Sequence, residues 1–233
     1  MEMAVLVRRV LLGTMMLCLA AVVRADGLEY RYEVGAMAGA GSYYGDANYT
    51  SPLNNFGFMG GALFRYNINP RMAVKADFAV ARISGTTVGG DYTFPGGDAG
   101  FARTLYELGA QYECHFLAYG DGTGYKQSRR VAPYFLVGLG LTYAPAPAKH
   151  LFTPNVPVGI GLKWKVAPRL NFGCELSYRF TFSDNLDVVH REGAVLDDPY
   201  GINSGLMKNK DGYSFMSVFL TYDLSPKYRK CNN

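Results

Sequence analysis

The stretch LNFGCELSYRFTF, residues 170–182, decides the fold because its apolar and polar residues alternate without a break. Every even position from Leu170 to Phe182 is apolar or aromatic, whereas the odd positions are Asn, Gly, Glu, Ser, Arg and Thr. A period of two places successive side chains on opposite faces of a β-strand. Thirteen residues in one register is long for a soluble strand and suits one that crosses a bilayer at a tilt. The stretch predicts a strand with an apolar face toward lipid and a polar face toward a lumen.

Seven further segments show the same alternation, although the last is less regular because Phe215 and Phe219 fall on the otherwise polar face. Eight is an even number, as closure of a bacterial barrel requires. The sequence therefore predicts an all-β protein, a closed antiparallel transmembrane β-barrel of about eight strands. The expected strands are Tyr30–Tyr43, Phe56–Asn67, Met72–Ser84, Phe101–Phe116, Val131–Tyr143, Val156–Val166, Leu170–Phe182 and Tyr213–Leu224.

The first 25 residues have the layout of a secretory signal peptide. Arg8 and Arg9 precede an apolar run that ends near Ala25, where cleavage is expected. That run is too short for a membrane-spanning helix. The expected organisation is a signal peptide over residues 1–25, an outer-membrane barrel over residues 26–224, and a basic periplasmic tail over residues 225–233.

Composition and charge agree with this class. The chain has 28 Gly, 18 Tyr and 14 Phe but one Trp, which favours strands and aromatic girdles over helices. The signal peptide holds three of the 23 basic and one of the 19 acidic residues, so 20 basic and 18 acidic residues remain. Such a balance gives no reason to expect nucleic acid as a partner.

The connections between the expected strands differ in length. With both termini in the periplasm, the connections 44–55, 85–100, 144–155 and 183–212 lie outside the cell. Two connections on the periplasmic side are tight turns around Pro70 and Pro168, as such barrels favour. The third, Leu117–Arg130, is long and departs from that rule.

The inward faces alternate glycine with charge. An eight-stranded barrel is barely wide enough for its own side chains, so small residues let the lumen fill. Charges of both signs are expected to pair there. Transport of solutes through the barrel is therefore not expected. The expected network is Arg65, Lys75, Asp77, Glu107, Glu113, Lys163, Glu175 and Arg179.

No catalytic, cofactor or metal motif stands out. His115 falls on the inward face beside Glu113 and is expected to join the lumen network. His150 and His190 fall in external loops, where they are either solvated loop residues or part of an active site. The prediction is a protein that is not an enzyme and needs no cofactor.

The expected periplasmic segments are rich in basic residues, whereas the acidic residues of the connections lie mostly in the expected external loops. One interpretation is chance sorting of solubilising charges, and the other is docking of an acidic periplasmic protein. In the second case Cys231 could form an intermolecular bond, although a free thiol is equally compatible. The candidate docking residues are Arg71, Arg129, Arg130, Arg169, Lys227, Arg229, Lys230 and Cys231.

Several stretches are similar to those of one family. They are Gly41-Ser-Tyr-Tyr-Gly-Asp46, Phe64-Arg-Tyr-Asn-Ile-Asn-Pro-Arg71, Ile83-Ser-Gly85 and the segment Val156–Val188. The chain resembles the PorG family, outer-membrane proteins of the Bacteroidetes type IX secretion system. Many members have Gly-Asp-Leu after the paired tyrosines, where this chain has Gly45-Asp46-Ala47.

The resemblance implies a non-enzymatic role in protein secretion. Family members anchor a periplasmic ring, built from a lipoprotein and its ring partner, to the outer membrane, and cargo does not pass through the narrow barrel. The expected partners are therefore outer-membrane lipid and these two ring proteins. Two alternatives stay open: a surface adhesin or ligand-binding barrel that uses the 183–212 loop, and an outer-membrane lipid-modifying enzyme.

Overall fold

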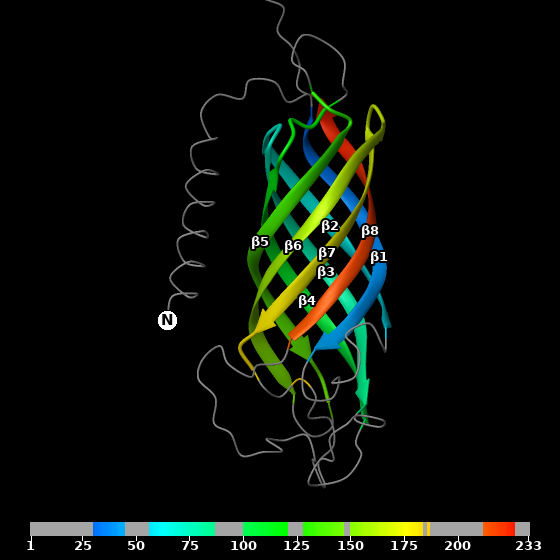
Figure 1. The fold of residues 1–233 in the computed structure, drawn as a ribbon, viewed down its shortest axis with the longest axis vertical. Coiled ribbons are helices and arrows are strands. Elements are labelled where there is room, and N and C mark those ends of the chain that lie inside the picture. The colour runs from blue at the N-terminus through cyan, green and yellow to red at the C-terminus, as the bar shows by residue number, and fades with distance from the viewer. Residues whose placement is uncertain are drawn as a thin grey trace, which may run out of the picture.

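The computed structural model describes residues 30–44, 56–86, 100–120, 128–146, 150–183, 186 and 212–226. They form eight antiparallel strands that close into one barrel (Figure 1). Each strand pairs with the next one along the chain, and the last pairs with the first, so the predicted closed eight-stranded barrel is confirmed. The strands are β1 Tyr30–Tyr44, β2 Gly57–Asn69, β3 Met72–Thr86, β4 Gly100–His115, β5 Val131–Ala144, β6 Leu151–Ala167, β7 Leu170–Thr181 and β8 Gly212–Pro226.

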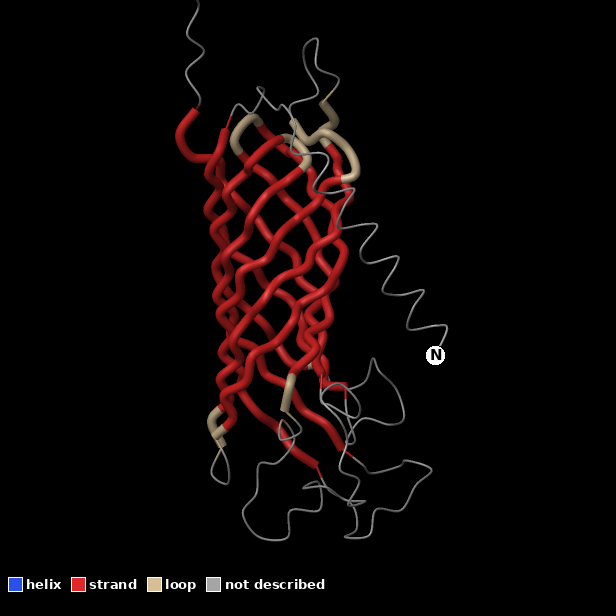
Figure 2. Tube along the Cα trace, turned by 90° about the vertical axis from the view of Figure 1, so that its left-hand side faces the viewer, coloured by secondary structure: helices blue, strands red, loops and turns tan. Residues whose placement is uncertain are grey.

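The two ends of the barrel differ. The connections 70–71, 116–130 and 168–169 lie at one end, together with the start of β1 and the finish of β8. We call this the turn end; it is uppermost in Figure 2. The opposite end, the loop end, receives the connections 45–56, 87–99, 145–150 and 182–211. The expected signal peptide and nearly all of the expected tail lie outside the described residues.

The start of the sixth strand differs from its prediction by five residues, whereas the other strand boundaries differ by two residues at most. The sequence predicted that the sixth strand starts at Val156, whereas β6 begins at Leu151 and pairs with β5 up to Ala144. Pro154 lies within this extension, and proline argues against a strand because it cannot donate to a ladder. The expected 144–155 loop therefore shrinks to residues 145–150.

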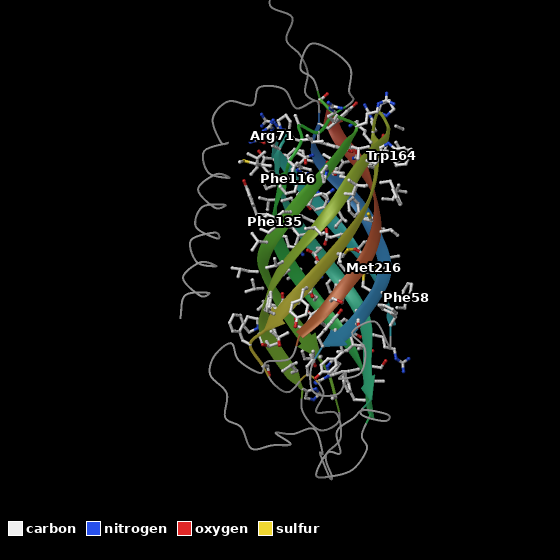
Figure 3. The ribbon with its side chains drawn as sticks, viewed as in Figure 1. Phe58, Arg71, Phe116, Phe135, Trp164 and Met216 are labelled. Atoms are coloured by element: carbon white, nitrogen blue, oxygen red, sulfur yellow. The ribbon has the colours of Figure 1, made fainter. Side chains whose placement is uncertain are left out.

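The outer wall of the barrel is apolar. Phe58, Leu139 and Ile160 are 75%, 72% and 62% exposed, far more than the large apolar side chains of a soluble core. In Figure 3 the labelled side chains Phe116, Trp164 and Met216 project outward from the wall. Within the described residues no helix is long and apolar enough to span a membrane.

The inward glycines leave room for large side chains from the neighbouring strands. A Cβ at Gly161 would collide with the ring of Tyr134, and one at Gly173 with the ring of Phe219. Tyr134 is fully buried and Phe219 nearly so. Glycine at these two positions thus provides the space in which the lumen fills with side chains.

Candidate functional site

The lumen carries a balanced set of buried charges. Among the described residues six basic and six acidic side chains are buried, and all twelve belong to the strands. Buried charges are tolerated when they are paired. The equal numbers allow this without a counter-ion from solvent. The set is Glu33, Arg65, Lys75, Asp77, Arg103, Glu107, Glu113, Lys163, Lys165, Glu175, Arg179 and Asp223.

Glu33 on β1 organises the part of the network nearest the turn end. Its carboxylate accepts from Arg65 Nη1 at 2.9 Å and from Lys163. Arg65 also pairs with Glu113 on β4, Nε to Oε2 at 2.8 Å. One carboxylate thus joins β1 to β2 and, across the lumen, to β6.

Two further groups continue toward the loop end. Lys75 pairs with Glu175 at 2.6 Å, and that carboxylate also accepts from the Tyr134 hydroxyl at 2.9 Å. Next, Arg179 pairs with Glu107 at 3.2 Å. Each ion pair is reinforced by hydrogen bonding, the condition under which buried pairs are tolerated.

The inward phenylalanines of β8 explain why its pattern looked irregular. The Arg179 guanidinium carbon lies 4.1 Å from the centroid of the Phe215 ring, and that of Arg65 lies 5.0 Å from the Phe219 ring. Both rings therefore lie inside as partners of cations. Their aromatic character does not mark a lipid-facing position.

The structure places all eight expected lumen charges inside the barrel, and it adds four that were not in the expected network. Glu33 and Lys165 fall on the polar face of their predicted strands, so the alternation of the sequence was enough to include them in the network. Asp223 was obscured by the irregular pattern of β8. Arg103 has a buried side chain near the loop end, where the expected strand had only just begun.

The turn end is covered by Tyr119, which comes from the long 116–130 connection. Its hydroxyl donates to Asn171 Oδ1 at 2.6 Å, and Lys163 Nζ lies 4.4 Å from its ring centroid. The Tyr119 amide donates to the Pro70 carbonyl at 2.8 Å, and Tyr119 bridges to Arg129. The unusual length of this connection lets it reach the mouth of the lumen.

The loop end is filled differently. Arg103 donates to the carbonyl oxygens of Leu186, at 3.2 Å, and Ala144. Leu186 is fully buried within an apolar cluster. That cluster includes Tyr43, Ile83, Phe101, Leu105 and Phe215. The loop end thus combines an apolar cluster with the buried Arg103 side chain.

Every exposed charged side chain in the described part of the chain is an arginine. Arg82 is near the loop end, and the others lie at the turn end; Arg71 is labelled in Figure 3. Arg31 has the inward parity but is exposed, since β1 begins only one residue earlier. Lys227, Arg229, Lys230 and Cys231 lie outside the described residues. We call Arg31, Arg71, Arg129, Arg130 and Arg169 the arginine rim.

The histidines do not assemble a recognisable active site in the described residues. His115 is buried in the lumen, with its ring centroid 5.2 Å from that of Tyr134 and 6.0 Å from that of Tyr119. His150 is exposed beside β6, and His190 is outside the described residues. The described part contains no group of three side chains that could hold a metal ion.

Comparison with known proteins gives a family match and several structural likenesses. The sequence model of the family described as Domain of unknown function (DUF6089) matches residues 8–233. No curated protein matches the sequence. Solved structures similar to this one include Neisserial surface protein A, at 16% identity over 83% of this chain and 97% of that chain with a TM-score of 0.48.

Two others are Ail, the attachment invasion locus protein of Yersinia pestis, and the outer membrane protein OprG of Pseudomonas aeruginosa. Ail is 12% identical over 84% of this chain and 100% of that chain, with a TM-score of 0.47. OprG is 9% identical over 86% of this chain and 99% of that chain, with a TM-score of 0.46.

Proposed function

The chain belongs to the DUF6089 family, and we propose that it is a non-enzymatic outer-membrane barrel whose arginine rim docks a periplasmic protein assembly. The observation that carries the proposal is the contrast between a filled lumen and an exposed, uniformly cationic rim. A filled lumen leaves no route for solutes, so the ends of the barrel are the surfaces that remain for function.

Membrane insertion is supported by the distribution of charge on the strands. All six carboxylates of the described residues are buried in the lumen, whereas the outer wall presents apolar and aromatic side chains. A closed barrel satisfies its backbone hydrogen bonds internally, as hydrocarbon demands. Polar-in and apolar-out alternation is the pattern of outer-membrane barrels.

The orientation follows from the connections. Outer-membrane barrels have short turns on the periplasmic side and longer loops outside. From the tight turns 70–71 and 168–169 we infer that the turn end, both barrel termini and the arginine rim face the periplasm. Arginines from three separate connections and from β1 meet there, although they are far apart in the sequence.

The resemblance to the PorG family supports a specific partner. That partner is the periplasmic ring of a type IX secretion system, which consists of a lipoprotein and a second ring protein. The arginine rim docks this ring and holds it at the outer membrane. Complementary charge would steer and orient that association. Cargo would pass elsewhere, because the barrel is filled by its own side chains.

The test is co-purification from outer membranes in mild detergent. We expect the tagged wild type to recover a periplasmic lipoprotein and its partner, identified by mass spectrometry. Reversing Arg71, Arg129 and Arg169 to glutamate should reduce that recovery at least about tenfold, since like charges facing one another cost several kcal/mol. Arg82→Glu, at the loop end, is the matched control and should leave recovery unchanged.

Recovery of the barrel alone from wild type would contradict the docking role. A surface-binding role is then the second candidate, favoured by the way Arg103 and buried Leu186 fix the start of the 182–211 connection to the barrel. If this connection binds a surface ligand, replacing residues 188–210 with a short linker should abolish that binding. Surface binding that survives the replacement would contradict this second candidate.

A further inference from the structure

We propose that Arg169, with Tyr30 and Tyr222, forms a binding site for the phosphate of an anionic phospholipid headgroup on the outer wall at the turn end. This inference rests on the bilayer-spanning part of the proposed function; Arg169 also belongs to the arginine rim, so the lipid site is tested in vesicles that contain no partner protein. It concerns a single place on the wall, where a cation, two phenols and an apolar surface meet.

The arginine is held in place by aromatic neighbours. Arg169 Nη1 donates to the Tyr222 hydroxyl at 3.3 Å, and the guanidinium carbon lies 5.6 Å from the centroid of the Tyr30 ring. The Asp223 amide donates to the Arg169 carbonyl at 2.8 Å, which fixes the turn that carries it. The guanidinium is thus oriented while its side chain stays exposed.

The carboxylate nearest in the chain to these phenols is already engaged. Asp223 accepts from Lys165 Nζ at 2.9 Å and from Asn171 Nδ2 at 2.7 Å, and it is buried. Tyr30 and Tyr222 contribute rings and hydroxyl groups but no carboxylate beside Arg169. The site therefore presents one oriented cation to an external anion.

The surroundings identify that anion as part of a lipid. Trp164 is 50% exposed and pairs with Val131 on one side and Phe172 on the other, which makes an apolar row on the wall. Leu220 extends the row beyond Phe172. Trp and Tyr gather at the depth of lipid headgroups. An anion bound by Arg169 thus has hydrocarbon-facing wall beside it, where acyl chains would lie.

The choice of arginine also fits phosphate. A guanidinium offers a rigid fork that can bond two phosphate oxygens at once, whereas an ammonium acts as a point charge. No lysine is exposed in the described residues. Lys165, near the end of β6 and close to the Arg169 turn in the chain, is buried. Arg169 thus has the side-chain geometry that suits an oxyanion.

Trp164 is the single tryptophan of the chain and reports on this site directly. The full mature protein would be reconstituted in phosphatidylcholine vesicles containing a fixed fraction of brominated lipid, which quenches nearby tryptophan. Brominated phosphatidylglycerol would be compared with brominated phosphatidylcholine. We expect phosphatidylglycerol to compete for the wall beside Trp164 roughly fivefold better, because one cation near a membrane surface contributes about that factor.

Arg169→Gln should remove the preference and leave quenching by phosphatidylcholine unchanged. Arg82→Gln, which removes an exposed arginine near the loop end, should keep the preference. Tyr222→Phe, which keeps the ring and removes the hydroxyl, should give an intermediate value. High salt should weaken the preference of the wild type, since exposed charges are screened.

Equal quenching of the wild type by the two lipids, or an undiminished preference in Arg169→Gln, would overturn the proposed site while leaving ring docking intact. Absence of quenching by either lipid would overturn both the site and the bilayer-spanning barrel. Loss of ring co-purification alone would leave the lipid site standing, because the vesicles contain no partner protein.

Discussion

At the scale of single residues, Glu33 is the side chain that holds the most buried polar partners in the part of the lumen nearest the turn end. It is the carboxylate partner of Lys163 and one of two partners of Arg65, and all three side chains are essentially fully buried. Asn67 and Thr221 also donate to it, at 2.6 and 3.1 Å. Four strands therefore meet at one carboxyl group.

We expect Glu33→Gln to lower the free energy of unfolding by about 3–5 kcal/mol, because removing one partner leaves Lys163 buried without its counter-charge. The measurement is reversible urea unfolding in vesicles. Arg82→Gln, an exposed arginine, should change stability by less than about 0.5 kcal/mol. Lys163→Met added to Glu33→Gln should restore part of the loss, and additive effects of the two changes would show that the pair is not coupled.

The alternation of residues along a strand predicted the inward face correctly wherever that face was uniformly small or charged. It placed Arg65, Lys75 and Glu175 on the inward face without any structure. It failed for Asp223, because Phe215 and Phe219 share its face and aromatic residues suggest lipid contact. A cation–π contact inside a lumen has no periodic signature in the sequence, so only the structure could identify it.

At the scale of elements, β6 is the strand that differs most from its prediction. Leu151–Asn155 belong to the ladder, and Thr153 and Asn155 are buried while Phe152 points out. Pairing runs through Pro154 to Ala144 and Leu151. A strand can thus carry proline near its end where the neighbouring residues keep their alternation.

Hydrogen exchange tests this extension. Ladder amides among residues 151–155 should exchange at rates comparable to those at the centre of β7, because strand hydrogen bonds protect them. Exchange as fast as that of an unprotected loop would place the start of β6 at Val156, as the sequence predicted. The amides of residues 117–118, which lie just beyond β4 and outside its ladder, provide the comparison with a connection in the same experiment.

The Tyr119 connection could not be found from the sequence, because a segment without regular period carries no information about what it covers. Only its length, unusual for this end of a barrel, marked it. The structure explains that length by contacts with Pro70, Asn171 and Lys163, which belong to three different parts of the chain.

At the scale of the whole molecule, the filled lumen predicts a barrel that does not conduct. Vesicles that contain the wild-type protein should show no swelling in small sugars and no single-channel currents above background. A sixteen-stranded porin in the same vesicles is the positive control, since barrels of that size leave an aqueous channel. Steady currents from the wild type would contradict a lumen packed with ion pairs and apolar side chains.

The pairing of Lys163 with Glu33 joins positions separated by 130 residues and strands that are not neighbours in the sheet. While β1 and β8 are apart, an open sheet holds cations and carboxylates on one face without their partners across the barrel. Such a face would be costly in hydrocarbon. The lumen charges thus find their partners only when β8 pairs with β1 and the barrel closes. We therefore expect the sheet to close while its inner face is still in water, before lipid surrounds the barrel.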